Sequence, residues 1–154
     1  LKNPKDLQKS VEALLAENTE LKKKLEKIEA KQLESLKNSL LKKTQQLNGT
    51  TFIGEVVEVS SSDALKKLCF DLKQGLANNY AVVLASNIDG KAQVAIMLDE
   101  ELSNSKKIEA PKIIKEHIAL LIKGGGGGQK TLATAGGQDA SNLNQVIEKV
   151  KSLL

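Results

Sequence analysis

The 154-residue chain carries 23 basic residues, all of them Lys, against 19 acidic residues, for a net charge of +4. Because Lys lacks the bidentate fork of Arg, this composition disfavours recognition of guanine edges. One Cys and one His exclude an internal disulfide and a metal cage, and no apolar run is long enough to span a membrane. These features favour a reducing cytoplasm, and the start at Leu1 rather than Met suggests a piece of a longer protein.

The front of the chain predicts a long helix, because residues 4–47 contain no Gly and no interior Pro. Residues spaced alternately by four and three form a heptad seam: Leu7, Val11, Leu14, Asn18, Leu21, Leu25 and Ile28. Asn18 falls at position a, where a polar residue fixes register, and Glu17 would face Lys22 of a second chain. The pattern predicts a parallel homodimer through residues 7–28.

The seam slips by one residue after Ile28 and continues at Leu33, Leu36, Leu40 and Leu47. The pattern leaves open whether the segment is one rod or a hairpin that folds back on its own chain. Residues 1–48 hold eleven Lys against seven acids, so the whole positive excess lies there. Such a face is either solvated or adds attraction for phosphates. We expect residues 1–48 to form a dimerisation segment and residues 49–154 a globular domain.

The globular part opens with Asn48-Gly49, which is expected to stop the long helix, and with a β-branched strand over 52–59. Ser60 to Asp63 offer N-caps for a helix whose apolar stripe is Leu65, Leu68, Cys69, Leu72 and Leu76. Cys69 lies within this stripe. It is therefore expected to be a small buried residue rather than a nucleophile.

Two strands over 80–86 and 91–98 are predicted to form a hairpin through Asp89-Gly90, and the acids at 99–101 are expected to be solvated loop charges. Pro111 opens a further helix, which carries His117 and is expected to end at Gly124. A last helix is expected to be capped by Asp139 or Ser141. The order β-α-β-β-α-loop-β-α predicts an α/β (α+β) domain, in which helices cover a mixed sheet.

Five glycines at 124–128 form the most unusual stretch, followed by Gln129-Lys130-Thr131. They are either a flexible tether or a place where backbone must approach something closely. Gln129 stands where a nucleotide-binding P-loop and a dinucleotide fold both need Gly, and the run follows a helix rather than a strand. The sequence therefore supports neither ATP nor NAD binding.

The stretch resembles the signature of the C-terminal domain of alanyl-tRNA synthetases, of the DHH-associated type. That signature is a Gly-rich run with an Arg, followed by Ala-x-Ala-Gly-Gly. Residues 133–137, Ala-Thr-Ala-Gly-Gly, match the second half, and Gly126 to Gly128 match the first. Gln129 replaces the usual Arg, and Gly125 replaces a frequent Lys. The order of elements agrees over essentially the whole chain.

The resemblance implies a non-catalytic module that binds tRNA(Ala) at its outer corner and couples the aminoacylation and editing domains of the enzyme. No cofactor or metal is expected here, since the ATP, alanine and zinc sites of such a ligase would lie upstream. Candidate RNA-binding residues are Gly124, Gly125, Gly126, Gly127, Gly128, Gln129, Lys130, Gly136 and Gly137. With three aromatic residues, recognition through backbone and shape is expected.

Two alternatives stay open. The substrate-binding domain of a DHH-family phosphoesterase shares the glycine run, but it needs a metal-binding domain rich in Asp and His. The neutral amide of Gln129 also weakens phosphate binding relative to Arg. A coiled-coil scaffold without a ligand would leave the entropic cost of the glycines unexplained.

Overall fold

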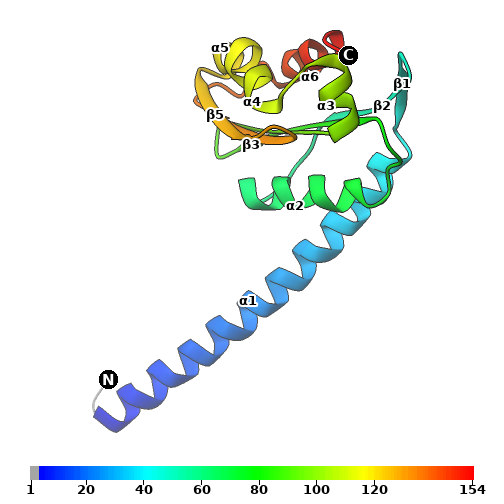
Figure 1. Ribbon diagram of the computed structural model, residues 1–154. Coiled ribbons are helices and arrows are strands. Elements are labelled where there is room, and N and C mark those ends of the chain that lie inside the picture. Colours follow the sequence, from blue (N-terminus) through cyan, green and yellow to red (C-terminus); the bar gives the residue numbers. More distant parts are fainter. Residues whose placement is uncertain (1–3) are drawn as a thin grey trace. The chain divides into compact units, whose positions relative to one another are not determined.

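A computed structural model of the protein describes residues 4–154 (Figure 1). Contacts divide the chain into two units, Leu1–Ser35 and Leu36–Leu154. A single helix, α1 (Pro4–Leu41), forms the described part of the first unit and enters the second, so the hairpin alternative is excluded. No helix within the described residues is long and apolar enough to cross a membrane.

The long helix ends six residues earlier than the sequence pattern suggested. Instead, residues 45–47 form strand β1 (Gln45–Leu47), which pairs antiparallel with strand β2 (Thr50–Val56). Asn48 and Gly49 are the turn between these strands, and both have positive φ, at 50° and 81°. Asn-Gly is a strong signal for a two-residue hairpin, and here it specifies a strand turn rather than a helix stop.

The globular unit is built on one six-stranded mixed sheet with strand order β1-β2-β3-β4-β6-β5. Its remaining strands are β3 (Tyr80–Ile88), β4 (Lys91–Leu98), β5 (Gly124–Gln129) and β6 (Leu132–Gly137). Strands β2 and β3 are parallel, and the other neighbours are antiparallel. The predicted hairpin at Asp89-Gly90 is confirmed, with φ of 52° and 79° at its two central residues.

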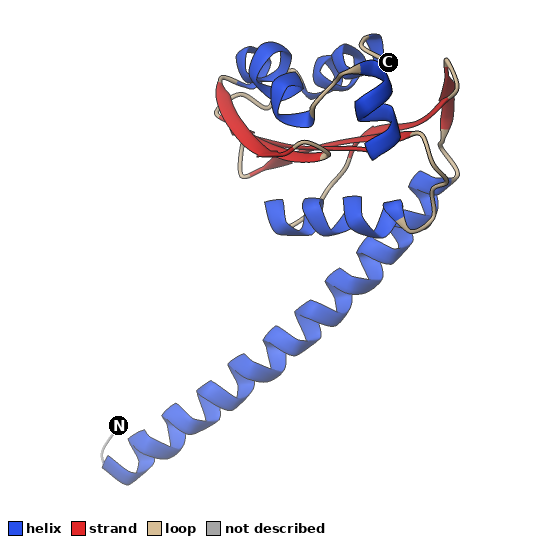
Figure 2. Ribbon diagram, in the orientation of Figure 1, coloured by secondary structure: helices blue, strands red, loops and turns tan. Residues whose placement is uncertain are grey.

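Helices cover both faces of the sheet (Figures 1 and 2). Helix α2 (Ser62–Lys73) lies on one face, and its N-cap Ser61 accepts a hydrogen bond from the Ala64 amide at 3.1 Å. The other face carries α3, α4, the π-helical segment η1, α5 and α6. These elements are α3 (Glu100–Lys106), α4 (Ala110–Ile113), η1 (Ile114–Ile118), α5 (Ala119–Ile122) and α6 (Leu143–Ser152). The predicted α+β class is confirmed.

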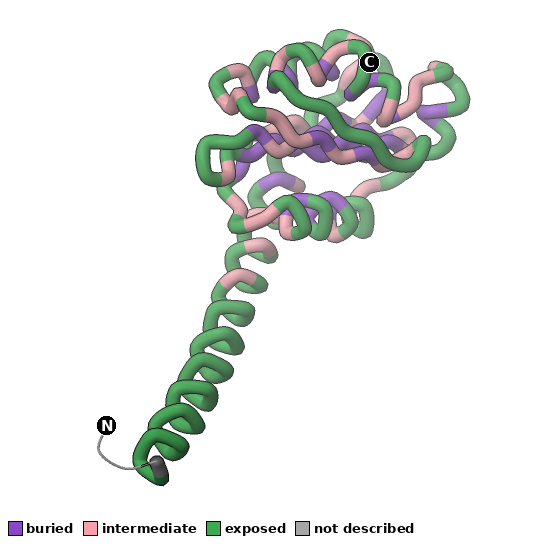
Figure 3. The backbone as a smooth tube through the Cα atoms, turned by 90° about the vertical axis from the view of Figure 1, so that its left-hand side faces the viewer, coloured by how far each residue is buried: buried purple, intermediate pink, exposed green. Residues whose placement is uncertain are grey.

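The central strands β3 and β4 are buried on both faces (Figure 3). Val83 and Ile96 belong to the core beneath η1, α5 and α6, whereas the adjacent residues Val82 and Met97 point to the opposite face. Strands that are buried on both faces consist of nearly continuous apolar residues, and such runs lie within the predicted strands 80–86 and 91–98.

Three helix ends differ from the sequence expectation. The acids after β4 are not loop charges, because Asp99 is the N-cap residue of α3 and Glu100 and Glu101 form its first turn. Lys123, rather than Gly124, takes the left-handed conformation that ends α5, with φ 50° and ψ 56°. The N-cap position of α6 is Asn142, and neither Asp139 nor Ser141 occupies it.

Candidate functional site

The glycine run is an edge strand of the sheet, not a loop. All six residues of β5 are exposed, and the strand pairs with β6 from Gly124↔Gly137 to Gln129↔Leu132. Lys130 and Thr131 form the two-residue connection between the strands. Five consecutive glycines therefore present an extended backbone at the margin of the domain (Figure 1). The loop expected from the sequence is therefore wrong, and the alternative of a flexible tether is excluded as well.

Alternate glycines of β5 are required by its close approach to β6. A Cβ on Gly126 would lie 2.5 Å from the Cα and 2.7 Å from the Cβ of Ala135, and it would strike the Thr134 carbonyl oxygen. The same backbone conflict occurs at Gly124 and Gly128. Since the obstacles are mainly backbone atoms, they cannot move aside as a flexible side chain would.

At the two intervening positions, Gly125 and Gly127, steric conflict does not require glycine. A Cβ on Gly125 or Gly127 would meet nothing within 4 Å, so both positions face open space. An ordinary edge strand is guarded by charges, Pro or bulges, because its unpaired N–H and C=O groups can template other chains. The β5 glycines lack such side chains. The edge is thus bare backbone that a ligand can approach closely.

Both ends of the β5–β6 hairpin are held in place. At the turn, the Leu98 amide donates to the Thr131 carbonyl at 2.8 Å and the Ala110 amide donates to the Lys130 carbonyl at 2.9 Å. The Lys130 ammonium donates to the side-chain oxygen of Asn104 at the surface. Lys130 thus places its positive charge beside the exposed strand, with its backbone fixed by α4 and β4.

At the open end of the hairpin, Lys123 and Asp139 form an ion pair, Nζ to Oδ2, of 3.2 Å. The Asp139 carboxylate also accepts hydrogen bonds from the Ser141 side chain and from the Ser141 amide, the latter at 3.0 Å. These hydrogen bonds from Ser141, with a smaller contribution from Lys123, lower the pKa of Asp139 to about 2. Nearby, Gly137 permits close packing, since a Cβ there would lie 2.7 Å from Ile122 Cβ.

A hollow of about 230 Å³ lies between α2 and the β5–β6 hairpin. Helix α2 packs on β3 and β4 and does not fill this space. The lining residues are Lys66, Phe70, Gly127, Gly128, Gln129, Leu132, Ala133 and Thr134. The lining thus contains one cation and no carboxylate, so the hollow suits a ligand that is partly flat and partly anionic.

Phe70 and Lys66 were not among the residues singled out from the sequence. The signal was present, because Phe70 falls outside the buried stripe of α2 formed by Leu65, Leu68, Cys69 and Leu72. An aromatic residue off the apolar face of a helix must be exposed, and Phe70 is 46% exposed. Phe52 and Tyr80, by contrast, are buried. What the sequence could not supply is that Phe70 faces the glycine strand.

The remaining reactive side chains lie outside this hollow. Cys69 is fully buried, and desolvation raises the pKa of its thiol to about 12, as expected for a packing residue. His117 lies on η1, with Nε2 3.9 Å from the Glu116 carboxylate. Among residues 4–154, His, Cys, Asp and Glu side chains form no group of three or more that could hold a metal.

The sheet order, the helices on both faces and the glycine edge define the class of this domain. Residues 49–154 match the family described as the DHHA1 domain, and the chain belongs to that family. It is also 38% identical over all 154 residues to an alanine–tRNA ligase of Cytophaga hutchinsonii, and 34% identical over 152 residues to that of Flavobacterium psychrophilum. The chain spans only 17% and 16% of these proteins.

A solved structure supports the same assignment. The C-Ala domain from Aquifex aeolicus alanyl-tRNA synthetase is similar with a TM-score of 0.64 and 27% identity, covering 72% of this chain and 96% of that one. The resemblance to the C-terminal domain of alanyl-tRNA synthetases, drawn from the glycine run and Ala133 to Gly137, is therefore confirmed.

Proposed function

We propose that this chain is the C-terminal tRNA-binding and oligomerisation module of an alanine–tRNA ligase. Aminoacylation and editing of tRNA(Ala) would be carried out by other domains of the longer protein, where ATP and zinc would also bind. The observation that carries the proposal is the similarity to such ligases along the whole chain. The two parts of the family signature, the glycine run and residues 133–137, also pair with each other as strands β5 and β6.

The geometry suits contact with an RNA backbone. Phosphate and sugar contacts need backbone N–H groups and Lys side chains at a surface the nucleic acid can approach closely. Strand β5 offers such backbone, and Lys130 adds a positive charge at its end. Because the chain has no Arg and a small net charge, recognition would rest on shape and backbone contacts rather than on base edges in a helix.

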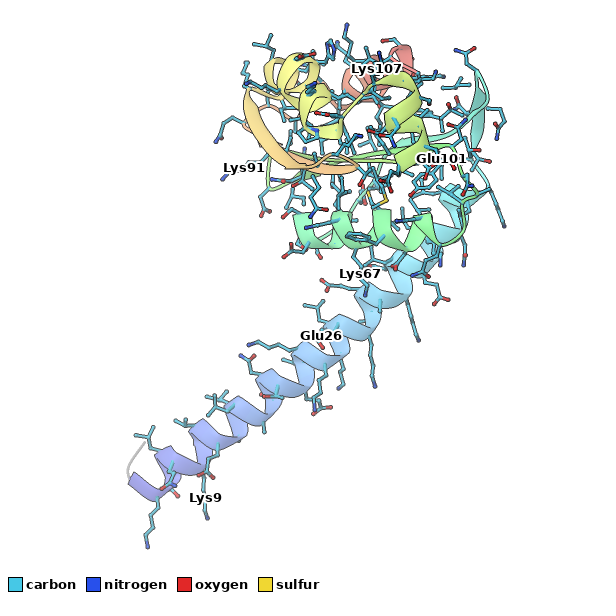
Figure 4. The ribbon with its side chains drawn as sticks, in the orientation of Figure 1. Lys9, Glu26, Lys67, Lys91, Glu101 and Lys107 are labelled. Carbon is cyan, nitrogen blue, oxygen red and sulfur yellow. The ribbon has the colours of Figure 1, made fainter. Side chains whose placement is uncertain are left out.

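Titration of the full chain with labelled tRNA(Ala) transcript at two salt concentrations tests this proposal. Lys130→Ala should weaken binding and lower the slope of log K against log salt by about one or less. Lys91→Ala is the matched control. Lys91, labelled in Figure 4, begins β4 beside the pair Ala92–Gly137, whereas Lys130 adjoins the other end of the β4–β6 ladder, where Met97 pairs with Leu132. Absence of tRNA binding by the unmodified chain at low salt would refute the proposal. If folded Lys130→Ala binds tRNA(Ala) as the unmodified chain does, the RNA surface lies away from β5, most simply along the Lys-rich helix.

Pairing of two chains through α1 is the second part of the proposal. The predicted seam residues are largely exposed: Leu7, Val11, Leu14, Leu21, Leu25 and Ile28 are 46–63% exposed. A stripe of this kind is stabilised by burial against a second helix, and Asn18 at position a favours a parallel dimer.

Sedimentation equilibrium measures this pairing directly. We expect twice the chain mass for the unmodified protein and the single chain mass for Leu21→Lys, which places a charge in the seam. Lys23→Glu changes a residue on the outer side of the helix and should leave the dimer intact. Asn18→Leu should raise stability and loosen the choice of oligomer. A monomer at high micromolar concentration would refute the pairing.

A phosphoesterase substrate domain is the remaining alternative, and the ligase relatives disfavour it. Under the proposed function, the chain alone forms no aminoacyl-tRNA with ATP and alanine and cleaves no oligoribonucleotide with Mn²⁺. Turnover that depends on the chain in either assay would contradict the module assignment. A cytoplasmic location is part of the same proposal, since it places the module with the translation machinery.

A further inference from the structure

We infer that the hollow between α2 and the β5–β6 hairpin takes one unpaired base of the bound tRNA, stacked on Phe70, with a neighbouring phosphate on Lys66. This inference rests on the proposed tRNA binding and specifies a contact within it. Three features carry it: an exposed aromatic ring, a cation on the same side of the helix, and a wall made of glycine backbone.

Phe70 supplies the stacking surface. Phe70 lines the hollow and is 46% exposed. The folded domain therefore does not bury this side chain in its core. Exposed aromatic rings bind unpaired bases by stacking, with little dependence on base identity. Of the three aromatic residues of this chain, Phe52 and Tyr80 lie in the core. Phe70 is therefore the aromatic residue whose ring is accessible for stacking on a base.

Lys66 supplies the charge. It precedes Phe70 by four residues, so the two side chains share one side of α2. No ion pair of Lys66 occurs within residues 4–154, and no carboxylate lines the hollow. An ammonium without a local counterion, beside an aromatic ring, matches the combination of phosphate and base that one nucleotide presents.

The lining on the hairpin side includes Gly127 and Gly128, together with Gln129 and Thr134. Gly127 pairs with Thr134, and a Cβ on Gly127 would enter open space. The missing side chain therefore keeps the hollow free. At about 230 Å³ it is smaller than the roughly 300 to 1,000 Å³ of pockets that enclose drug-sized ligands, so it suits a single base.

The test is titration of labelled tRNA(Ala) transcript with the full chain and its variants. Phe70→Leu, which keeps an apolar side chain but removes the ring, should weaken binding about tenfold, whereas Phe70→Tyr should bind within about twofold of the unmodified chain. Gly127→Val adds a side chain at a lining residue where a Cβ meets nothing within 4 Å, and it should weaken binding similarly. Circular dichroism melts confirm that each variant is folded.

Lys66→Gln and Lys67→Gln form a matched pair that separates a local contact from general charge. Lys67 is exposed on the same helix but does not line the hollow (Figure 4). Lys66→Gln should weaken binding and lower the salt slope by about 0.7, with a smaller effect from Lys67→Gln. Phe70→Leu should leave the slope unchanged.

The outcomes distinguish this inference from the proposed function. If the unmodified chain binds tRNA(Ala) and folded Phe70→Leu and Gly127→Val bind equally well, the hollow is not a base site while the proposed function stands. Equal effects of Lys66→Gln and Lys67→Gln would likewise overturn the phosphate contact. If the unmodified chain does not bind tRNA(Ala), the proposed function and this inference fall together.

Discussion

Gly126 lies opposite Ala135 in the β5–β6 ladder, so close that a Cβ on Gly126 would lie 2.7 Å from that of Ala135. Its neighbour Gly125 pairs with Gly136 in the same ladder, yet a Cβ there meets nothing within 4 Å. Three glycines of the run (Gly124, Gly126 and Gly128) are thus required by packing, whereas Gly125 and Gly127 are not. The two groups can be separated by experiment.

Gly126→Ala should destabilise the domain by about 1–3 kcal/mol, because the added methyl group overlaps fixed backbone of β6. Gly125→Ala should change the free energy of unfolding by no more than about 1 kcal/mol, and in the stabilising direction, by restricting the unfolded chain. Guanidinium unfolding followed by circular dichroism measures both. Equal destabilisation would show that packing does not distinguish alternate glycines of this strand.

Asp99 should contribute to stability through the loop before β3 rather than through helix capping. Its Oδ2 accepts a hydrogen bond from the backbone N–H of Asn79 at 2.7 Å, and its side chain makes no cap hydrogen bond in α3. Asp99→Ala leaves that partly buried amide without its acceptor and should cost about 1–3 kcal/mol. Asp99→Asn, which keeps an acceptor oxygen, should cost less. Chemical unfolding measures both changes in stability. Equal destabilisation by the two variants would show that the hydrogen bond accepted by Asp99 is not the source of its contribution.

The Cys69 thiol should resist modification in the folded protein. Because burial raises its pKa to about 12, almost none of it is thiolate at pH 8, and reagents must also reach a fully buried atom. We expect a thiol reagent to label the native chain only as fast as it unfolds, and to label it at once in concentrated guanidinium. Rapid stoichiometric labelling of the native chain would contradict this burial.

Asp139 should titrate near pH 2 in the folded state. The pKa is lowered by hydrogen bonds from Ser141 first and by Lys123 second, so the ionised form is favoured by folding. A lowered folded pKa gives a stability contribution that is complete above the unfolded value of about 3.8 and is lost as pH falls toward 2. Carboxyl-carbon NMR follows the midpoint directly. Ser141→Ala removes the largest single cause and should raise the midpoint, and an unchanged midpoint in that variant would contradict the role of the Ser141 hydroxyl.

Much of the architecture could be read from local pattern. The heptad seam from Leu7 to Ile28 indicated α1, the runs around Val83 and Ile96 indicated buried strands, and Asp89-Gly90 indicated their turn. Each signal is carried by neighbouring residues whose spacing matches the period of a helix or strand. The signature at Gly126–Gly128 and residues 133–137 indicated the family in the same local way.

Other features depended on contacts between distant residues. Asn48-Gly49 could end a helix or turn a hairpin, and pairing of Gln45 with Phe52 decided for the hairpin. The glycine run has no side chains whose spacing could indicate a helix or a strand. Its strand conformation follows from its pairing with β6.

The sequence by itself determined that the chain has a long heptad helix, a mixed α/β domain and an unguarded glycine run, because these follow from residue type and spacing. The tertiary structure alone decided that the run is an edge strand, that Gly124, Gly126 and Gly128 are fixed by the β6 backbone, and that Phe70 and Lys66 face Gly127. The last of these relationships joins α2 to β5, more than fifty residues apart in the chain, and the packing of α2 on β3 and β4 brings them together.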